Sequence, residues 1–285
     1  PPTKSPRFLT KSLYAIALPF HPLSISGPSM SHHIVEVHDL TFQYPDGHQA
    51  LQGVSFRITH GESVAVVGAN GAGKSTLLLH LNGCLTPQQG TVRIGDVPLT
   101  KHTLADIRRT VGMVFQDTDD QLFMPTVGED VAFGPLNLGL PPAEVDARVR
   151  EALQRVGAEG LEDRPPHRLS GGEKRGVAIA TVLAMRPDIL VMDEPSSSLD
   201  PRARRRLIAL LRSFQHTKII ATHDLDMVME VCTRTVVFHR GTVVADGPTA
   251  EIFADADLLE RSGLERPLSI QGCPVCGTAA ARGGG

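Results

Sequence analysis

The sequence predicts an α/β fold in which a mainly parallel core sheet carries a phosphate-binding loop. Residues 68–76 read Gly-Ala-Asn-Gly-Ala-Gly-Lys-Ser-Thr, which fits the pattern G-x-x-x-x-G-K-[ST] without a mismatch. An apolar run at 63–67 precedes the loop and a helix-like run at 76–81 follows it, which is the context that the motif needs. Residues 189–192 form a second apolar run, as expected of a central strand in a parallel sheet.

Hydrophobic periodicity and turn residues predict the other elements. Residues 34–38 alternate as in a half-buried strand, and an antiparallel β lobe is expected over residues 34–62 and 90–96. A helical subdomain is expected over about residues 117–185. The individual elements are a turn at 43–47, strands at 51–58, 91–94, 111–115 and 219–222, helices at 142–156, 171–185, 201–214 and 249–262, and a hairpin at 235–244.

The chain of 285 residues divides into three predicted segments. We expect residues 1–29 to be an unstructured extension, with Met30 as the natural start. The alternative is a targeting signal, but the apolar stretch is short and Pro19 interrupts it. Residues 30–245 are expected to form the main domain, and residues 246–285 a helical segment followed by a flexible tail rich in Gly and Ala.

Composition excludes several classes of function. The formal net charge is −3, which is not the basic footprint of a nucleic-acid partner. Four scattered cysteines do not form a disulfide framework, so a reducing compartment is expected. No apolar run reaches the roughly 18 residues that a membrane span needs.

The loop at 68–76 is predicted to bind a nucleoside triphosphate. Its glycines let the backbone wrap phosphate oxygens, and the N-terminus of the following helix adds positive potential. Lys74 supplies a charge for the β and γ phosphates, and Ser75 can place its hydroxyl on Mg²⁺. The residues expected to contact the nucleotide here are Gly68, Asn70, Gly71, Ala72, Gly73, Lys74, Ser75 and Thr76.

Two acids directly follow the apolar strand at 189–192. Asp193 and Glu194 stand at the carboxyl end of a predicted parallel strand, where ligands bind to such sheets. Asp193 is expected to hold Mg²⁺ through water, and Glu194 to polarise an attacking water. The alternative is an acid that only caps the next helix, and the phosphate loop in the same chain disfavours it.

A second anion site is predicted where residues 169–172 read Leu-Ser-Gly-Gly and open a helix. A hydroxyl and two glycines at a helix N-terminus, here Ser170, Gly171 and Gly172, can bind a phosphate. One triphosphate does not need two such sites in one chain. We therefore expect the second site to serve a nucleotide on another copy, within a dimer.

These motifs, in this order, resemble those of the ATP-binding-cassette (ABC) ATPases over about residues 34–245. The loop at 68–76 resembles the family's Walker A motif, residues 169–172 its signature and residues 189–194 its Walker B motif with the catalytic glutamate. Residues 198–200 look like the D-loop that joins two protomers. One departure is Glu173, where many relatives carry glutamine.

The resemblance assigns three further residues and a cofactor set. Gln116 looks like the Q-loop glutamine that touches Mg²⁺ and the membrane partner. His223 looks like the switch histidine at the γ-phosphate, and Tyr44 stands where the family stacks an aromatic ring on adenine. The implied cofactors are ATP and Mg²⁺. The implied catalytic residues are Glu194, His223, Gln116 and Lys74, and the implied Mg²⁺ ligands are Ser75, Gln116 and Asp193.

The segment at 114–137 narrows the resemblance to the energy-coupling-factor transporters, most closely their cobalt/nickel group, and residues 176–185 and 263–268 fit the same group. This implies an ATPase bound peripherally at the cytoplasmic face of the cell membrane that powers import of cobalt or nickel. The implied partners are a second ATPase protomer, identical or paralogous, a transmembrane coupling subunit and a metal-binding membrane subunit. The alternatives are the ATPase of another importer and a soluble ABC ATPase outside transport.

Three features carry two interpretations each. Apolar residues after the Q-loop predict a groove for a partner helix, or only packing within the helical subdomain; they are Leu122, Phe123, Met124, Val131, Ala132 and Phe133. The arginines at 202–206 are expected on a solvated face rather than at lipid headgroups. Cys273 and Cys276 resemble half a zinc site, but the missing second pair disfavours metal binding.

Overall fold

The computed structural model describes residues 33–271, which fall into two compact units. We call the unit with residues 33–101 and 215–271 the P-loop unit, and the unit with residues 102–214 the signature unit. The expectations for residues 1–29, Cys273 and Cys276 lie outside the described residues.

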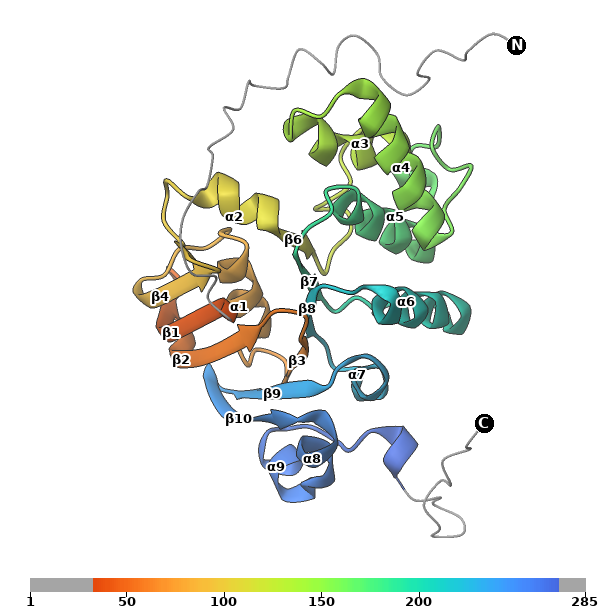
Figure 1. Cartoon of the computed structure of the whole chain (residues 1–285). Helices are drawn as coiled ribbons and strands as arrows, with labels where there is room; N and C mark the ends of the chain where they lie inside the picture. The colour runs from red at the N-terminus through yellow and green to blue at the C-terminus, as the bar shows by residue number, and fades with distance from the viewer. Residues whose placement is uncertain (1–32, 272–285) are drawn as a thin grey trace, which may run out of the picture. The chain divides into compact units, whose positions relative to one another are not determined.

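An antiparallel sheet forms one layer of the P-loop unit, with strand order β2-β1-β4-β5. Figure 1 shows β2, β1 and β4 side by side. Its strands are β1 (His33–Gln43), β2 (Gln49–Thr59), β4 (Gln89–Ile94) and β5 (Val97–Pro98). Val35 pairs with Ile58 on one side and with Ile94 on the other, and all three side chains are buried. The alternating apolar residues therefore line the inner face of the sheet, and the predicted antiparallel lobe is confirmed.

A second sheet of the P-loop unit contains the strand that leads into the phosphate loop. Its strands are β3 (Ser63–Val67), β8 (Thr217–Ala221), β9 (Arg234–His239) and β10 (Thr242–Pro248). β3 pairs in parallel with β8 and with β9, and β10 forms the predicted hairpin with β9. Every residue of β8 is buried, as in parallel strands covered on both faces. Helix α1 (Lys74–Leu81) contacts β2, β4 and β8.

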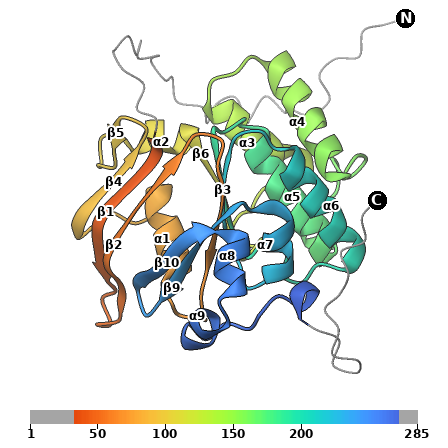
Figure 2. The ribbon, with the colours of Figure 1, turned by 60° about the horizontal axis from the view of Figure 1, so that its bottom comes forward.

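The helix predicted at 249–262 is in fact two helices, α8 (Thr249–Ala254) and α9 (Ala256–Arg261). Asp255 between them has φ −83° and ψ 92°, and its carboxylate accepts a hydrogen bond from Leu258 N at 2.9 Å. An aspartate that caps a new helix competes with continuation of the previous one. α8 packs against β10 and helix α7 (Leu225–Val231) (Figure 2), and a 3₁₀ turn, η3 (Leu268–Ile270), lies near the end of the described chain.

The signature unit is built on two parallel strands and five helices among the described residues. The strands are β6 (Val111–Val114) and β7 (Ile189–Asp193), and both are wholly buried. The helices are α2 (Leu104–Thr110), α3 (Val127–Asn137), α4 (Pro142–Val156), α5 (Gly171–Leu183) and α6 (Pro201–Ser213), with a 3₁₀ turn η2 (Pro166–Arg168) before α5. The central strand predicted at 189–193 is confirmed.

Helices α3, α4 and α5 pack on one another in the predicted helical subdomain (Figure 1). Gly112 lets α5 lie close to β6. A Cβ at this position would collide with Val182 of α5 and with Pro187. α3 continues through Pro135 to Asn137. The absent side chain of Gly134 lets α3 lie close to Met185, since a Cβ there would meet Met185 at 2.6 Å.

Candidate functional site

The phosphate loop of the P-loop unit depends on glycine at its two ends. Gly68 has φ 156° and Gly73 has φ 103°, both in the range that favours glycine. A Cβ at Gly68 would collide with the carbonyl oxygen of Phe238, and a Cβ at Gly73 with that of Ala50. The loop is thus closed against β9 and β2, and the space that side chains would fill is occupied by backbone.

Lys74 lies inside this loop. Its Nζ donates hydrogen bonds to Gly68 O at 2.8 Å and to Ala69 O at 3.2 Å, and the residue is buried. The N-cap residue Gly73 makes no side-chain cap, so the first backbone N–H groups of α1 are not capped by a side chain. A cradle of glycines, an ammonium group held by carbonyls and a helix N-terminus fit a triphosphate.

Tyr44 is joined to the helix that follows the loop. Its hydroxyl is 3.1 Å from Thr76 Oγ1, and its ring packs edge-on against Phe42. Sequence reasoning missed His80, whose Nδ1 lies 2.7 Å from Thr76 O. Burial lowers the pKa of His80, so this ring supports α1 as a neutral group.

His223 stands at the same sheet edge as the loop, because β8 and β3 are paired parallel strands with Ala221 beside Val66. The side chain of His223 is exposed. Asp224, directly after it, accepts a hydrogen bond from Met227 N at 2.9 Å and so caps α7. The P-loop unit thus brings together the predicted loop residues and His223 at one edge.

The signature unit holds the other predicted residues. Ser170 is the N-cap of α5 in a capping box: Glu173 N donates to Ser170 Oγ at 3.3 Å, and Ser170 N donates to Glu173 Oε2 at 2.8 Å. Ser170 Oγ also donates to Glu173 Oε2 at 2.8 Å, and the two hydrogen bonds that Ser170 donates to this carboxylate lower the pKa of Glu173. Gly171 is exposed, and a Cβ there would meet nothing within 4 Å.

Gln116 and the two predicted acids follow neighbouring strands of the signature unit. Val114 of β6 pairs with Met192 of β7, so Gln116, Asp193 and Glu194 come at the carboxyl ends of a parallel pair. Asp193 and Glu194 are buried. Glu194 has φ 46°, a strained conformation for a residue other than glycine that is concentrated at functional sites.

Sequence reasoning also missed Arg175, a buried guanidinium on α5. It donates hydrogen bonds to Phe115 O and Gln116 O, both at 2.7 Å. Burial lowers the pKa of Arg175, against the opposing charges of Asp117, Asp193 and Glu194. The sequence places this charged residue in a helix whose C-terminal half is apolar, but it does not indicate which groups Arg175 contacts.

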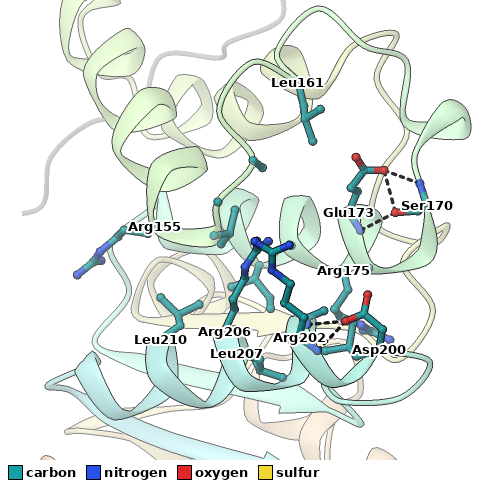
Figure 3. Close-up of a pocket in the computed structure, with 18 of the residues that line it drawn as sticks. Arg155, Leu161, Ser170, Glu173, Arg175, Asp200, Arg202, Arg206, Leu207 and Leu210 are labelled. Atoms are coloured by element: carbon teal, nitrogen blue, oxygen red, sulfur yellow. Dashed lines mark hydrogen bonds between the residues drawn. The ribbon is translucent and has the colours of Figure 1, made fainter.

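A pocket of about 340 Å³ lies beside Ser170, between the end of α4, α5 and α6 (Figure 3). Arg202 and Arg206 rise into it from α6. The basic run at 202–206 is therefore divided, since Arg204 and Arg205 do not line the pocket. Ser170 and Gly172 line it but Gln116, Asp193 and Glu194 do not, so the structure does not gather all predicted residues of this unit in one cavity.

Residues 51–197 match the family described as "ABC transporter". The chain belongs to the ABC transporter ATP-binding family. Over 248 residues this ABC protein is 70% identical to an ABC transporter ATP-binding protein of Geobacter sulfurreducens, covering 87% of this chain and 100% of that one. Over 240 residues it is 49% identical to the energy-coupling factor transporter ATP-binding protein EcfA of Methanocaldococcus jannaschii, covering 82% and 86%.

Two solved structures resemble this ABC protein. One is cbiO1 from Clostridium perfringens, described as part of the ABC transporter complex cbiONQ, with a TM-score of 0.71, 40% identity and 81% and 94% of the two chains covered. The other is the dimeric cassette MJ0796 in a post-hydrolysis state with ADP and phosphate, with a TM-score of 0.70, 28% identity and 75% and 98% covered. The predicted P-loop ABC fold is confirmed, and the protein is an ABC ATPase that binds ATP.

Within residues 33–271 no helix is long and apolar enough to cross a membrane.

Proposed function

We propose that this ABC ATPase is of the energy-coupling-factor type and powers the import of a cobalt or nickel ion. The similarity to EcfA and to cbiO1, which is described as part of a transporter complex, supports the type. The segment at 114–137, which resembles the cobalt/nickel group, supports the cargo. The membrane subunits read the cargo, so the chain contributes ATP hydrolysis and its coupling.

The observation that carries the ATPase role is Lys74, whose ammonium group is held inside the glycine loop by Gly68 O. In the proposed mechanism Lys74 neutralises the β and γ phosphates, Glu194 orients the attacking water and His223 holds the γ-phosphate. Tyr44 packs on the adenine. Oxygen donors from Ser75, Gln116 and Asp193 suit Mg²⁺, which would supply further neutralisation of phosphate charge.

We propose that the working unit is a dimer with a second ATPase protomer, either a copy of this chain or a paralogue. Ser170, Gly171 and Gly172 would cap the nucleotide bound to Lys74 of the other protomer. Gly171 is exposed, and the side chain of Ser170 caps the N–H of Glu173 only, which supports this role. A transmembrane coupling subunit and a metal-binding membrane subunit would complete the transporter at the cytoplasmic face of the membrane.

The coupling surface is proposed at an aromatic pair of the signature unit. Leu122, Val131 and Ala132 are buried, as the packing interpretation requires. Phe123, in contrast, is 62% exposed, and its ring packs edge-on against Phe133 with 5.0 Å between centroids. An exposed ring packed on a second ring offers an apolar contact for a partner helix, so we narrow the proposed docking site to Phe123 and Phe133.

Ion uptake by cells distinguishes the candidate functions. The chain is expressed with a transmembrane coupling subunit and a metal-binding membrane subunit from the same organism, and accumulation of radioactive cobalt and nickel is measured against a Glu194→Gln control. Accumulation that depends on Glu194 is expected. ATP hydrolysis without accumulation of either metal would contradict the cargo and favour another importer, and failure to co-purify with any membrane subunit would favour a soluble ATPase.

A further inference from the structure

Arg175 connects three segments of the signature unit. It lies on α5, five residues after the N-cap Ser170. Its Nη1 donates to Phe115 O at 2.7 Å, and its Nη2 donates to Gln116 O at 2.7 Å and to Ser197 Oγ at 3.2 Å. Ser197 belongs to the turn after β7, where Ser197 N donates to Glu194 O at 3.1 Å. One guanidinium therefore links the signature helix, the Q-loop backbone and the turn that carries Glu194.

Side chains of Gln121 and Lys174 make further contacts between residues 115–121 and α5. Gln121 Oε1 accepts a hydrogen bond from Phe115 N at 3.1 Å, while its Nε2 donates to Ala178 O at 2.7 Å and to Thr181 Oγ1 at 2.8 Å. Lys174 Nζ and Asp119 Oδ1 form an ion pair. Phe115 is thus held through both its N–H and its carbonyl group, each by a side chain that reaches across to or from α5.

Burying the charged Arg175 side chain costs free energy that packing alone does not explain. Arg175 is 5% exposed, and among the described residues its buried Nε has no hydrogen-bond partner. A well-packed apolar side chain of similar volume often replaces a buried charge without loss of stability. The planar fork of arginine, however, can hold two neighbouring carbonyl groups at fixed positions, which an apolar side chain cannot do.

We propose that Arg175 is a positioning residue of the ATPase reaction, which holds the backbone of Gln116 and the turn after Glu194 in register with the signature helix. The inference rests on the proposed roles of Gln116 and Glu194. Through Arg175, a displacement of Ser170 at the start of α5 is passed to Gln116 as a displacement of its carbonyl group. A nucleotide at the signature and a metal ion near Gln116 would therefore influence each other through this one side chain.

Hydrogen exchange on the full-length protein tests whether Arg175 holds the backbone of Phe115 and Gln116, and this measurement does not depend on catalysis. Arg175→Met keeps side-chain volume and removes the fork, and Arg175→Lys keeps the charge but cannot span two carbonyl groups. Amide exchange in residues 113–118 is expected to become about 10-fold faster in both variants, since local protection depends on local contacts. The matched control is Arg186→Met, which removes an exposed arginine that pairs only with Glu151 in the described chain.

The consequence for the reaction is tested by the Mg²⁺ dependence of ATP hydrolysis. In Arg175→Met the Mg²⁺ concentration for half-maximal rate is expected to rise about 10-fold, the usual effect of losing a group that orients a metal ligand. ATP binding to the P-loop in EDTA, measured with a fluorescent ATP analogue, is expected to stay within about twofold. Thermal unfolding of Arg175→Met is measured alongside, because a role in stability alone would lower the melting temperature without changing the Mg²⁺ dependence.

Gln116→Ala separates failure of this inference from failure of the proposed function. If Gln116→Ala shifts the Mg²⁺ dependence and Arg175→Met does not, the positioning role is wrong and the role of Gln116 stands. If neither variant shifts it, the role of Gln116 is wrong and the inference falls with it. If amide exchange in residues 113–118 is unchanged in both Arg175 variants, Arg175 does not hold this backbone, whatever the kinetics show.

Discussion

The two units hold their functional residues by different means. In the P-loop unit, the carbonyl groups of Gly68 and Ala69, within the same nine-residue motif, hold Lys74. In the signature unit, Arg175 holds Phe115 and Gln116 from about 60 residues away along the chain. The first arrangement is local and is set by glycines and one lysine. The second depends on side chains that meet only in the folded protein, so we expect it to respond to changes far from the nucleotide.

Replacing Glu194 should change ATP hydrolysis more than any other substitution. Glu194→Gln removes the group that orients water while leaving the phosphate loop intact. We expect ATP hydrolysis to fall by about 10²–10⁴-fold, the usual contribution of a general base, with ATP binding retained and nucleotide-bound dimers accumulating. The measurement is steady-state phosphate release beside ATP binding and sizing chromatography. Turnover equal to wild type would remove Glu194 from its role.

A glycine substitution tests how local the loop is. Gly73→Ala places a methyl group against Ala50 O in a residue with φ 103°. We expect a loss of about 1–3 kcal/mol in unfolding free energy and at least about a 10-fold loss in ATP affinity. Gly61→Ala is the matched control, because Gly61 has φ 82° but open space around a Cβ. Equal effects of the two changes would show that strain, and not the closed loop, explains the cost.

The coupling surface of the signature unit gives the next effect. Phe123→Asp is expected to lower recovery of the membrane subunits in co-purification by about 10-fold or more, because a charge replaces an exposed ring at the proposed docking site. ATP binding by the isolated chain is expected to persist. Undiminished co-purification would exclude this site. Leu268→Asp is the control, since Leu268 is also exposed, at 74%, but lies in the P-loop unit.

The effect of pH on stability should be the smallest, and it concerns Asp130, whose carboxylate binds the backbone at Phe123. Asp130 Oδ1 accepts hydrogen bonds from Phe123 N and Met124 N, both at 3.0 Å, and burial raises the pKa of Asp130 from 3.8 to about 6. Between these values the unfolded chain releases the proton first, so the unfolding free energy falls as pH rises. The slope from this group is at most about 1.4 kcal/mol per pH unit.

Asp130→Asn is expected to remove this slope while keeping an oxygen that can accept the same two hydrogen bonds. Urea unfolding of both proteins between about pH 4 and pH 7 gives the difference. Identical pH dependence in the two proteins would mean that Asp130 is ionised in the folded state over the whole range.

The sequence predicted the features that depend on neighbouring residues better than the features that depend on residues far apart in the chain. The phosphate loop could be read because its glycines, lysine and flanking strands are contiguous, and β7 could be read because all five of its residues are buried. The break at Asp255 was missed because a capping carboxylate outweighed a helical pattern. Arg175 was missed because its partners, Phe115, Gln116 and Ser197, are distant in sequence, and no periodicity encodes a contact of that kind.

Mixing two inactive variants shows whether the loop of one chain works with the signature of another. Lys74→Ala removes the lysine of the loop, and Ser170→Arg blocks the N-terminus of α5. Each variant alone should be inactive as a homodimer. When the purified variants are mixed, each mixed dimer contains one intact pair of Lys74 and Ser170, and ATP hydrolysis should return in proportion to mixed dimers. If mixed dimers form, as shown with two different affinity tags, and no activity returns, composite sites are contradicted.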